Sequence, residues 1–138
     1  MLYRAGRTST YPEEPVDSGM RFHFLGGAGE VGNVGCVIED QGGMKVLMDY
    51  GLAPTKPPKY PSEAPLIDHA IITHSHIDHI GMAPWLVGHH GTTLHGSRLT
   101  SGLSEIMWRD TYKVSSIEGY PLAWDRSCLL YTSPSPRD

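Results

Sequence analysis

The feature that most constrains this chain is a stretch of six residues that holds three histidines and one aspartate. The four side chains are those of His74, His76, Asp78 and His79. An apolar run at 70–72 precedes them and predicts a buried strand. If residues 74–76 stay extended, the first two histidines point the same way, because strand side chains repeat with a period of two. Imidazole nitrogen and carboxylate oxygen are zinc ligands, so the stretch predicts a metal site, and a catalytic zinc keeps one position for water.

A structural interpretation of the same residues needs no metal. A lone histidine is usually a surface or hydrogen-bonded residue, and Asp78 alone could cap a helix that begins after it. A density of four such side chains directly after an apolar run favours the metal interpretation over this one.

The stretch resembles the H-x-H-x-D-H motif of the metallo-β-lactamase-fold hydrolases. The resemblance implies that His74 and His76 bind one zinc ion, and that Asp78 and His79 bind a second. It also assigns Asp78 to the catalytic machinery. The implied architecture is a mixed α/β fold, the four-layer αββα sandwich, of which this chain holds only the N-terminal half.

A glycine-rich loop at 27–32 fits the G-x-G-x-x-G pattern of dinucleotide-binding proteins. That pattern requires a helix that opens at the glycines, but Gly32 and Gly35 interrupt it and residues 36–39 favour a strand. We therefore expect a hairpin-like loop whose glycines adopt positive φ. The loop resembles the G-x-G-E-x-G element of the β-CASP nucleases, the RNA-processing branch of the superfamily, as does the spacing of Gly81 and Pro84.

Composition limits what else the chain can be. Its 138 residues suit one modest domain, and 16 Gly and 11 Pro make it rich in turns. It has no run of about eighteen apolar residues and no apolar signal core, so we expect no membrane span and a cytoplasmic protein. The net charge of −4 offers nucleic acid no general attraction. Cys36 and Cys128 do not form a zinc-finger pair.

Both ends of the chain differ from its middle. Residues 1–19 are polar, and Met20 stands directly before the first convincing strand. We expect 1–19 to be a flexible leader or Met20 to be the natural start, with a short ordered extension as the alternative. Residues 128–138 resemble a translated sequencing-library adapter, so we expect read-through there and exclude them from fold reasoning. The domain is then 20–127, the N-terminal part of a metallo-β-lactamase-like domain.

Hydrophobic periodicity predicts the regular elements. We expect strands at 21–25, 36–39, 44–51, 66–73 and 92–95, and helices at 79–87 and 97–115. The prolines in 52–66 predict an irregular loop. Helical spacing in 97–115 predicts core packing for Leu99, Leu103, Ile106, Met107 and Tyr112.

Asp49 ends the strand predicted at 44–51. A carboxylate beside a zinc cluster can accept a ring N–H from a ligand histidine and so fix its tautomer. The resembling family has an aspartate here, so we assign Asp49 to the catalytic machinery in this supporting role. The alternative is an aspartate that merely ends a strand. We interpret the remaining histidines of this region, His69, His89, His90 and His95, as structural or surface residues.

The resemblance implies a zinc-dependent ribonuclease that hydrolyses RNA phosphodiesters, with this chain as an inactive fragment. The remaining metal ligands and the region that clamps RNA lie downstream in that family. Candidate partners are RNA, a second copy in a homodimer, and the subunits of a processing complex. Two alternatives remain: a metallo-β-lactamase-fold hydrolase acting on a thioester or lactone, and a non-catalytic RNA-processing subunit. Endonuclease or exonuclease action, and RNA or DNA as substrate, stay open.

Overall fold

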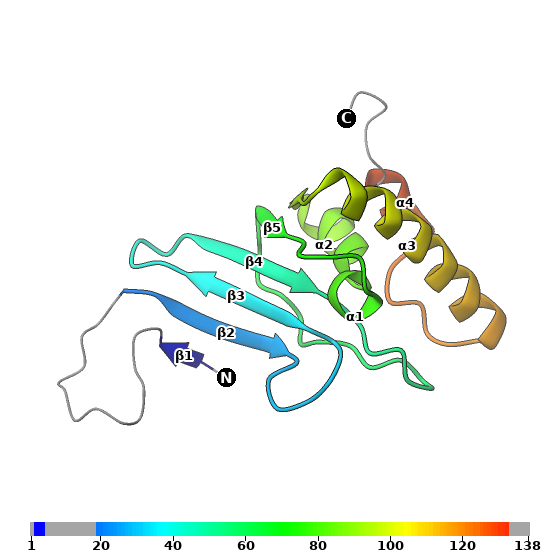
Figure 1. Cartoon of the computed structure of the whole chain (residues 1–138), viewed down its shortest axis with the longest axis horizontal. Helices are drawn as coiled ribbons and strands as arrows, with labels where there is room; N and C mark the ends of the chain where they lie inside the picture. The colour runs from blue at the N-terminus through cyan, green and yellow to red at the C-terminus, as the bar shows by residue number, and fades with distance from the viewer. Residues whose placement is uncertain (1, 5–18, 133–138) are drawn as a thin grey trace.

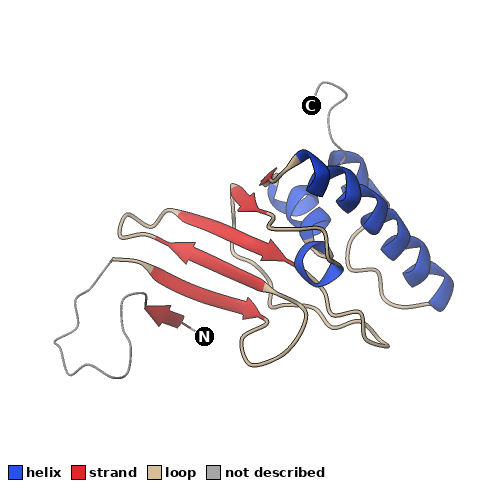
Figure 2. Ribbon diagram, in the orientation of Figure 1, coloured by secondary structure: helices blue, strands red, loops and turns tan. Residues whose placement is uncertain are grey.

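A computed structural model of the chain describes residues 2–4 and 19–132. Within these ranges the strands form one six-stranded sheet, in sequence order across it. The strands are β1 (Leu2–Arg4), β2 (Arg21–Gly26), β3 (Gly35–Glu39), β4 (Lys45–Tyr50), β5 (His69–Ile71) and β6 (Thr93–His95). The helices are α1 (Ile77–Ile80), α2 (Ala83–His90), α3 (Arg98–Glu118) and α4 (Arg126–Thr132). The helices lie together beside β5, and β1 to β3 extend away from them (Figures 1 and 2).

The mixed α/β class is confirmed, because helices accompany a sheet that contains both antiparallel and parallel strand pairs. Strands β1 to β4 pair antiparallel, whereas β4 with β5 and β5 with β6 pair parallel. Antiparallel neighbours can be joined by a tight turn, and parallel ones need a longer crossover. The β3–β4 turn is closed by the Asp40 carboxylate, which accepts from the Met44 N–H at 2.8 Å. The described residues thus form one sheet with its helices, as expected for half of an αββα sandwich.

One face of the sheet is buried against the helices. Val37, Leu47, Ala70 and Leu94 are successive partners across β3 to β6, and the first three are fully buried. Ile71, whose side chain alternates to the other face, is 41% exposed. The apolar run predicted to be a buried strand is therefore buried on one face only, because alternation turns Ile71 to the other face.

Two tryptophans tie the helical layer to the end of α1. The Trp108 Nε1–H, from α3, donates to the Ile80 carbonyl oxygen at 2.7 Å. The Trp124 Nε1–H donates to the Gly81 carbonyl oxygen at 2.8 Å. Both indoles are buried, so each contributes a large apolar surface together with a satisfied polar group.

The prediction for the core face of α3 is wrong in part. Leu99 is 72% exposed, and Leu103 and Ile106 are exposed as well. Met107 and Tyr112 do pack against the core, and Trp108 is buried. The helix is rotated so that the large indole faces inward, where its N–H finds the Ile80 carbonyl. Helical spacing alone does not identify which of two apolar stripes faces the core.

Two other elements are shorter than predicted. The strand expected at 66–73 pairs only over His69–Ile71, and the helix expected at 79–87 is divided. Pro84 stands in the first turn of α2, where a missing N–H costs no helical bond. The chain therefore ends α1 and begins a new helix after Met82.

The segments predicted at both ends are only partly described. Of the predicted leader, residues 2–4 pair with β2 and residue 19 is described, while 1 and 5–18 lie outside the described residues. Residues 126–132 form α4, in which Cys128 is buried against α2 at Gly88. The assignments of 1–19 as a leader and 128–138 as read-through stay predictions, and 133–138 also lies outside the described residues. No helix in 19–132 is both long and apolar enough to cross a membrane.

We expect Tyr50→Phe to lower the free energy of unfolding by about 1–3 kcal/mol. The buried Tyr50 hydroxyl donates to the Ser62 carbonyl oxygen at 2.8 Å and accepts from the Ala64 N–H at 3.0 Å. Burial raises the pKa of Tyr50 to about 12, so the hydroxyl keeps the proton it donates. Urea unfolding followed by fluorescence measures the change.

Tyr60→Phe is the matched control for this substitution. Its hydroxyl donates to the Pro121 carbonyl oxygen in an exposed hydrogen bond, where water can replace the lost partner. A cost for Tyr60→Phe equal to that for Tyr50→Phe would contradict the role assigned to the buried pair of bonds.

Candidate metal site

Asp49 owes its position to a bulge in β4. Cys36 pairs with Met48 and Gly35 pairs with Tyr50, so Asp49 is an extra residue without an opposite partner on β3. Its φ of 58° lies in the left-handed region, which aspartate tolerates better than most residues. Bulges of this kind redirect a side chain, and here the Asp49 carboxylate reaches the residues that follow β5.

The Asp49 carboxylate is 3% exposed and accepts three hydrogen bonds from the segment after β5. The Thr73 N–H donates to Oδ1 at 2.8 Å, and the Thr73 hydroxyl donates to Oδ2 at 2.7 Å. The His79 ring nitrogen Nδ1 lies 2.8 Å from Oδ2. An ionised carboxylate only accepts, so His79 carries its proton on Nδ1. The bond to a histidine of the motif is the contact expected for Asp49 from the sequence.

The structure brings the four predicted ligands together. The ring centroids of His74 and His79 are 4.0 Å apart, and those of His74 and His76 are 4.7 Å apart. Asp78 Oδ2 lies 3.7 Å from His79 Nε2. His76 is the N-cap residue of α1, and no side chain makes a capping hydrogen bond to this helix. Asp78 therefore does not cap the helix.

Backbone hydrogen bonds hold this cluster against the segment that follows the glycine loop. The Val34 N–H donates to the Asp78 carbonyl oxygen at 3.0 Å, and the Gly51 N–H donates to the Val34 carbonyl oxygen at 2.9 Å. The loop at 27–32 is a hairpin connection between antiparallel β2 and β3, with positive φ at Gly27, Gly29 and Gly32. The predicted hairpin-like loop is confirmed. The sequence did not reveal that Val34, which follows this loop, binds the backbone of Asp78.

Glu30 joins the glycine loop to the proline-rich loop. Its carboxylate accepts from Lys59 Nζ at 2.8 Å and from Asn33 Nδ2 at 3.0 Å. The Lys59 ammonium, with the Asn33 amide, holds the pKa of Glu30 below its usual value. Glu30, the acidic residue of the G-x-G-E-x-G element, therefore links the two loops through hydrogen bonds.

The side chains offer two pairs of ligands, and each pair suits a divalent metal ion. His74 and His76 lie side by side, and His79 presents Nε2 beside Asp78 because its Nδ1 is engaged by Asp49. Across 2–4 and 19–132, no three or more His, Cys, Asp or Glu side chains are arranged to hold one metal ion. Each pair would therefore need further ligands to complete a coordination sphere.

The other histidines make contacts that require no metal. His69 Nδ1 and His95 Nε2 are 2.9 Å apart on neighbouring strands. His89 stacks on the Trp85 indole, and the His90 ring meets the same indole edge-on. The assignment of these four histidines as structural or surface residues, not ligands, stays a prediction.

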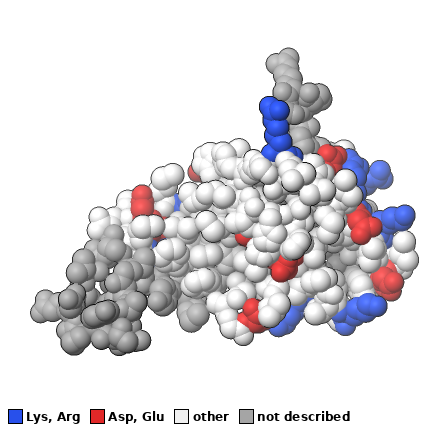
Figure 3. Space-filling view, in the orientation of Figure 1, with Lys and Arg blue, Asp and Glu red and all other residues white. Residues whose placement is uncertain are grey.

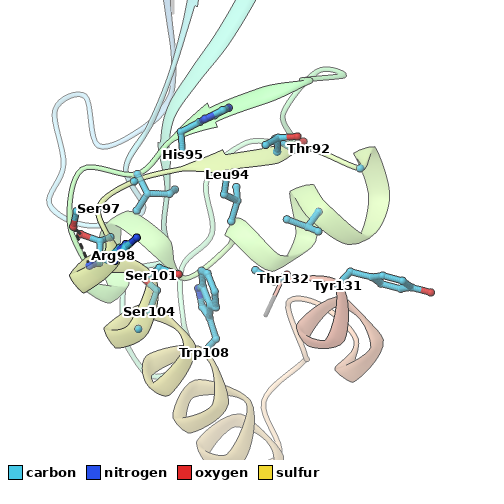
Figure 4. A pocket seen from close by; sticks show the side chains of 17 residues that line it. Thr92, Leu94, His95, Ser97, Arg98, Ser101, Ser104, Trp108, Tyr131 and Thr132 are labelled. Carbon is cyan, nitrogen blue, oxygen red and sulfur yellow. Dashed lines mark hydrogen bonds between the residues drawn. The ribbon is translucent and has the colours of Figure 1, made fainter. Parts of the chain in front are cut away.

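A separate pocket of about 800 Å³ lies between β6, α3 and α4 (Figure 4). Its lining includes Trp108, Arg98 and the buried Ser104 hydroxyl, but none of the four predicted ligands. His95 is the one imidazole in this lining. We place the chemistry at the histidine cluster instead, because acid, base and metal-donor groups converge there and not in the pocket.

Comparison with known proteins agrees with the geometry. The Metallo-beta-lactamase superfamily matches residues 29–121. The chain is 30% identical over 131 residues to "Transcription termination factor FttA" of Methanocaldococcus jannaschii, covering 86% of this chain and 20% of the relative. It is 30% identical over 145 residues to "Endoribonuclease ysh-1" of Neurospora crassa, covering 94% and 16%. An "RNase J-like protein" of M. jannaschii is 33% identical over 99 residues, covering 70% and 21%.

The chain thus spans about a fifth of the length of these relatives. The match includes the glycine loop from Gly29 onward, Asp49 and the whole histidine stretch.

We expect Gly51→Ala to lower the free energy of unfolding by about 1–3 kcal/mol. A methyl group at Gly51 would overlap the backbone carbonyl of Asp78, so the backbone that carries the cluster must move. Urea unfolding measures the loss, and chemical shifts of the histidine rings report the displacement.

The matched control is Gly102→Ala in α3. Nothing lies within 4 Å of a methyl group at this position, and alanine favours a helix over glycine by about 0.5–1 kcal/mol. This control should be as stable as the wild type or more so. Wild-type stability and unchanged histidine shifts in Gly51→Ala would show that the close approach to Asp78 is unimportant.

Proposed function

Because the chain belongs to the metallo-beta-lactamase superfamily, we propose that it is part of a zinc-dependent ribonuclease that hydrolyses RNA phosphodiesters. The observation that carries this proposal is the cluster of His74, His76, Asp78 and His79, in which Asp49 holds the His79 ring. Imidazole and carboxylate donors in this combination suit zinc. Two of the relatives are named as ribonucleases, and the third is named for transcription termination.

Each residue of the cluster has a role in this proposal. His74 and His76 hold one zinc ion, and Asp78 and His79 hold the second. Asp49 keeps the His79 proton on Nδ1 at 2.8 Å, which leaves the Nε2 lone pair for the metal. When bound, the metal pair supplies a nucleophile by lowering the pKa of water and neutralises charge on the phosphate.

RNA contacts in this proposal come mainly from parts of the complete protein that this chain does not span. Contacts to a phosphate backbone come mainly from Lys and Arg, and the chain has a net charge of −4. On the face shown in Figure 3, Lys and Arg side chains are interspersed with Asp and Glu. The chain spans about a fifth of its relatives' length, so we also assign the ligands that complete the metal site to the remainder.

In the complete protein, we expect His76→Ala to remove bound zinc and ribonuclease activity together, with activity reduced at least about 100-fold. The substitution deletes one donor of a pair, so the first ion loses half of the ligands that this region supplies. Elemental analysis of the purified protein and cleavage of a labelled RNA measure the two quantities.

His89→Ala is the control, since His89 stacks on Trp85 outside the cluster and should leave zinc content and activity unchanged. Retention of both by His76→Ala refutes the ligand assignment. If the wild-type complete protein binds zinc and hydrolyses a thioester or lactone but does not cleave RNA, the small-molecule hydrolase is favoured instead.

We expect the 138-residue chain alone to bind zinc weakly and to show no ribonuclease turnover. Its donors are offered in pairs, and no set of three in the described segments can hold one ion. Isothermal titration with zinc, together with an RNA cleavage assay, tests this. Tight binding of two ions per chain, or turnover abolished by a chelator, contradicts it.

A further inference from the structure

The Thr73 hydroxyl lies between Asp49 and the first histidine of the motif. Its Oγ1 is 2.7 Å from Asp49 Oδ2 and 2.9 Å from His74 Nδ1. Asp49 Oδ2 is also the atom that His79 Nδ1 contacts at 2.8 Å. One carboxylate oxygen therefore reaches His79 directly and His74 through one hydroxyl.

Counting protons assigns a direction to each of these bonds. A threonine hydroxyl has a single hydrogen to donate and two lone pairs to accept with. The ionised Asp49 oxygen only accepts, so the Thr73 hydrogen is used on Asp49 and Thr73 must accept from His74. The proton of a neutral His74 ring is then on Nδ1, and its Nε2 carries the free lone pair. This is the same tautomer that Asp49 imposes on His79.

We propose that Thr73 is a positioning residue, which sets the tautomer and ring orientation of His74 so that Nε2 is presented to the metal. The inference rests on the proposed metal-binding function and extends it to a residue outside the ligand motif. By this arrangement a single buried carboxylate prepares one ligand from each pair of donors.

The hydroxyl is separable from the structural role of Thr73. The Thr73 N–H already ties the backbone to Asp49 Oδ1 at 2.8 Å, and a substitution of the side chain leaves this bond in place. Without the hydroxyl, His74 loses the partner that holds its proton on Nδ1. A ring protonated on Nε2 cannot bind a metal through that atom, so part of the population becomes incompetent for binding. Partners of ligand histidines are typically worth about 10–100-fold in metal affinity.

The tautomers are measured first in the metal-free 138-residue chain. Long-range ¹H–¹⁵N correlation spectra of ¹⁵N-histidine protein, recorded at about pH 8, distinguish the two ring nitrogens of a neutral imidazole. We expect His74 and His79 to be protonated on Nδ1 in the wild type and in Thr73→Ser. Thr73→Val should change His74 and leave His79 as it is. A wild-type His74 protonated on Nε2, or an unchanged His74 in Thr73→Val, overturns the proposal.

The wild-type spectrum tests the proposal even if Thr73→Val fails to fold, and Thr73→Ser tests whether the hydroxyl is sufficient. Zinc affinity is then compared in the complete protein by competition with a chelating dye. We expect a loss of about 10–100-fold in Thr73→Val and near-wild-type affinity in Thr73→Ser. Equal affinities in all three proteins overturn the positioning role. If none of them binds zinc while the tautomers are as expected, the proposed metal function fails and the hydrogen-bond chain stands.

Discussion

The structure depends above all on the burial of the Asp49 carboxylate. A buried charge costs several kcal/mol unless hydrogen bonds replace the lost water. Here the donors come from Thr73 and His79, which follow a different strand from the one that carries Asp49. The end of β4, the end of β5 and the first turn of α1 are therefore tied together by one polar interaction. The hydrogen bonds that the Asp49 carboxylate accepts therefore fix the positions of the histidines.

This interaction works because the surrounding backbone leaves little freedom. On one side, Val34 and Gly51 contact the Asp78 backbone so closely that a side chain at Gly51 has no room. On the other side, the Trp108 indole binds the carbonyl of Ile80, the last residue of α1, and the Trp124 indole binds that of Gly81, which follows it. Residues from four separate parts of the sequence thus fix one short helix. A site of this kind is preorganised by packing before any ligand is bound.

The location of the cluster also follows from the sheet. β4 and β5 are parallel neighbours, so their carboxyl ends meet at the same edge, which is where open α/β sheets place their ligand sites. The bulge at Asp49 adds the one adjustment that alternation does not provide. The superfamily match covers both strands and the loop between them. The common edge of β4 and β5 explains why the donors of the motif converge within a chain that spans about a fifth of the length of its relatives.

By itself, the sequence determined the mixed α/β class, the hairpin loop at 27–32, most of the elements and the group of donors at 74–79. The class follows from the resemblance of the motif at 74–79 to a known family. The other features depend on local periodicity, glycine chemistry and donor type, which neighbouring residues specify. Only the tertiary structure decided that a bulge turns Asp49 toward Thr73, that the Thr73 hydroxyl links it to His74, and that Trp108 faces the core while Leu99 does not. The physical reason is that these features are contacts between distant segments, and a periodic pattern states which side chains are apolar without stating which surface they meet.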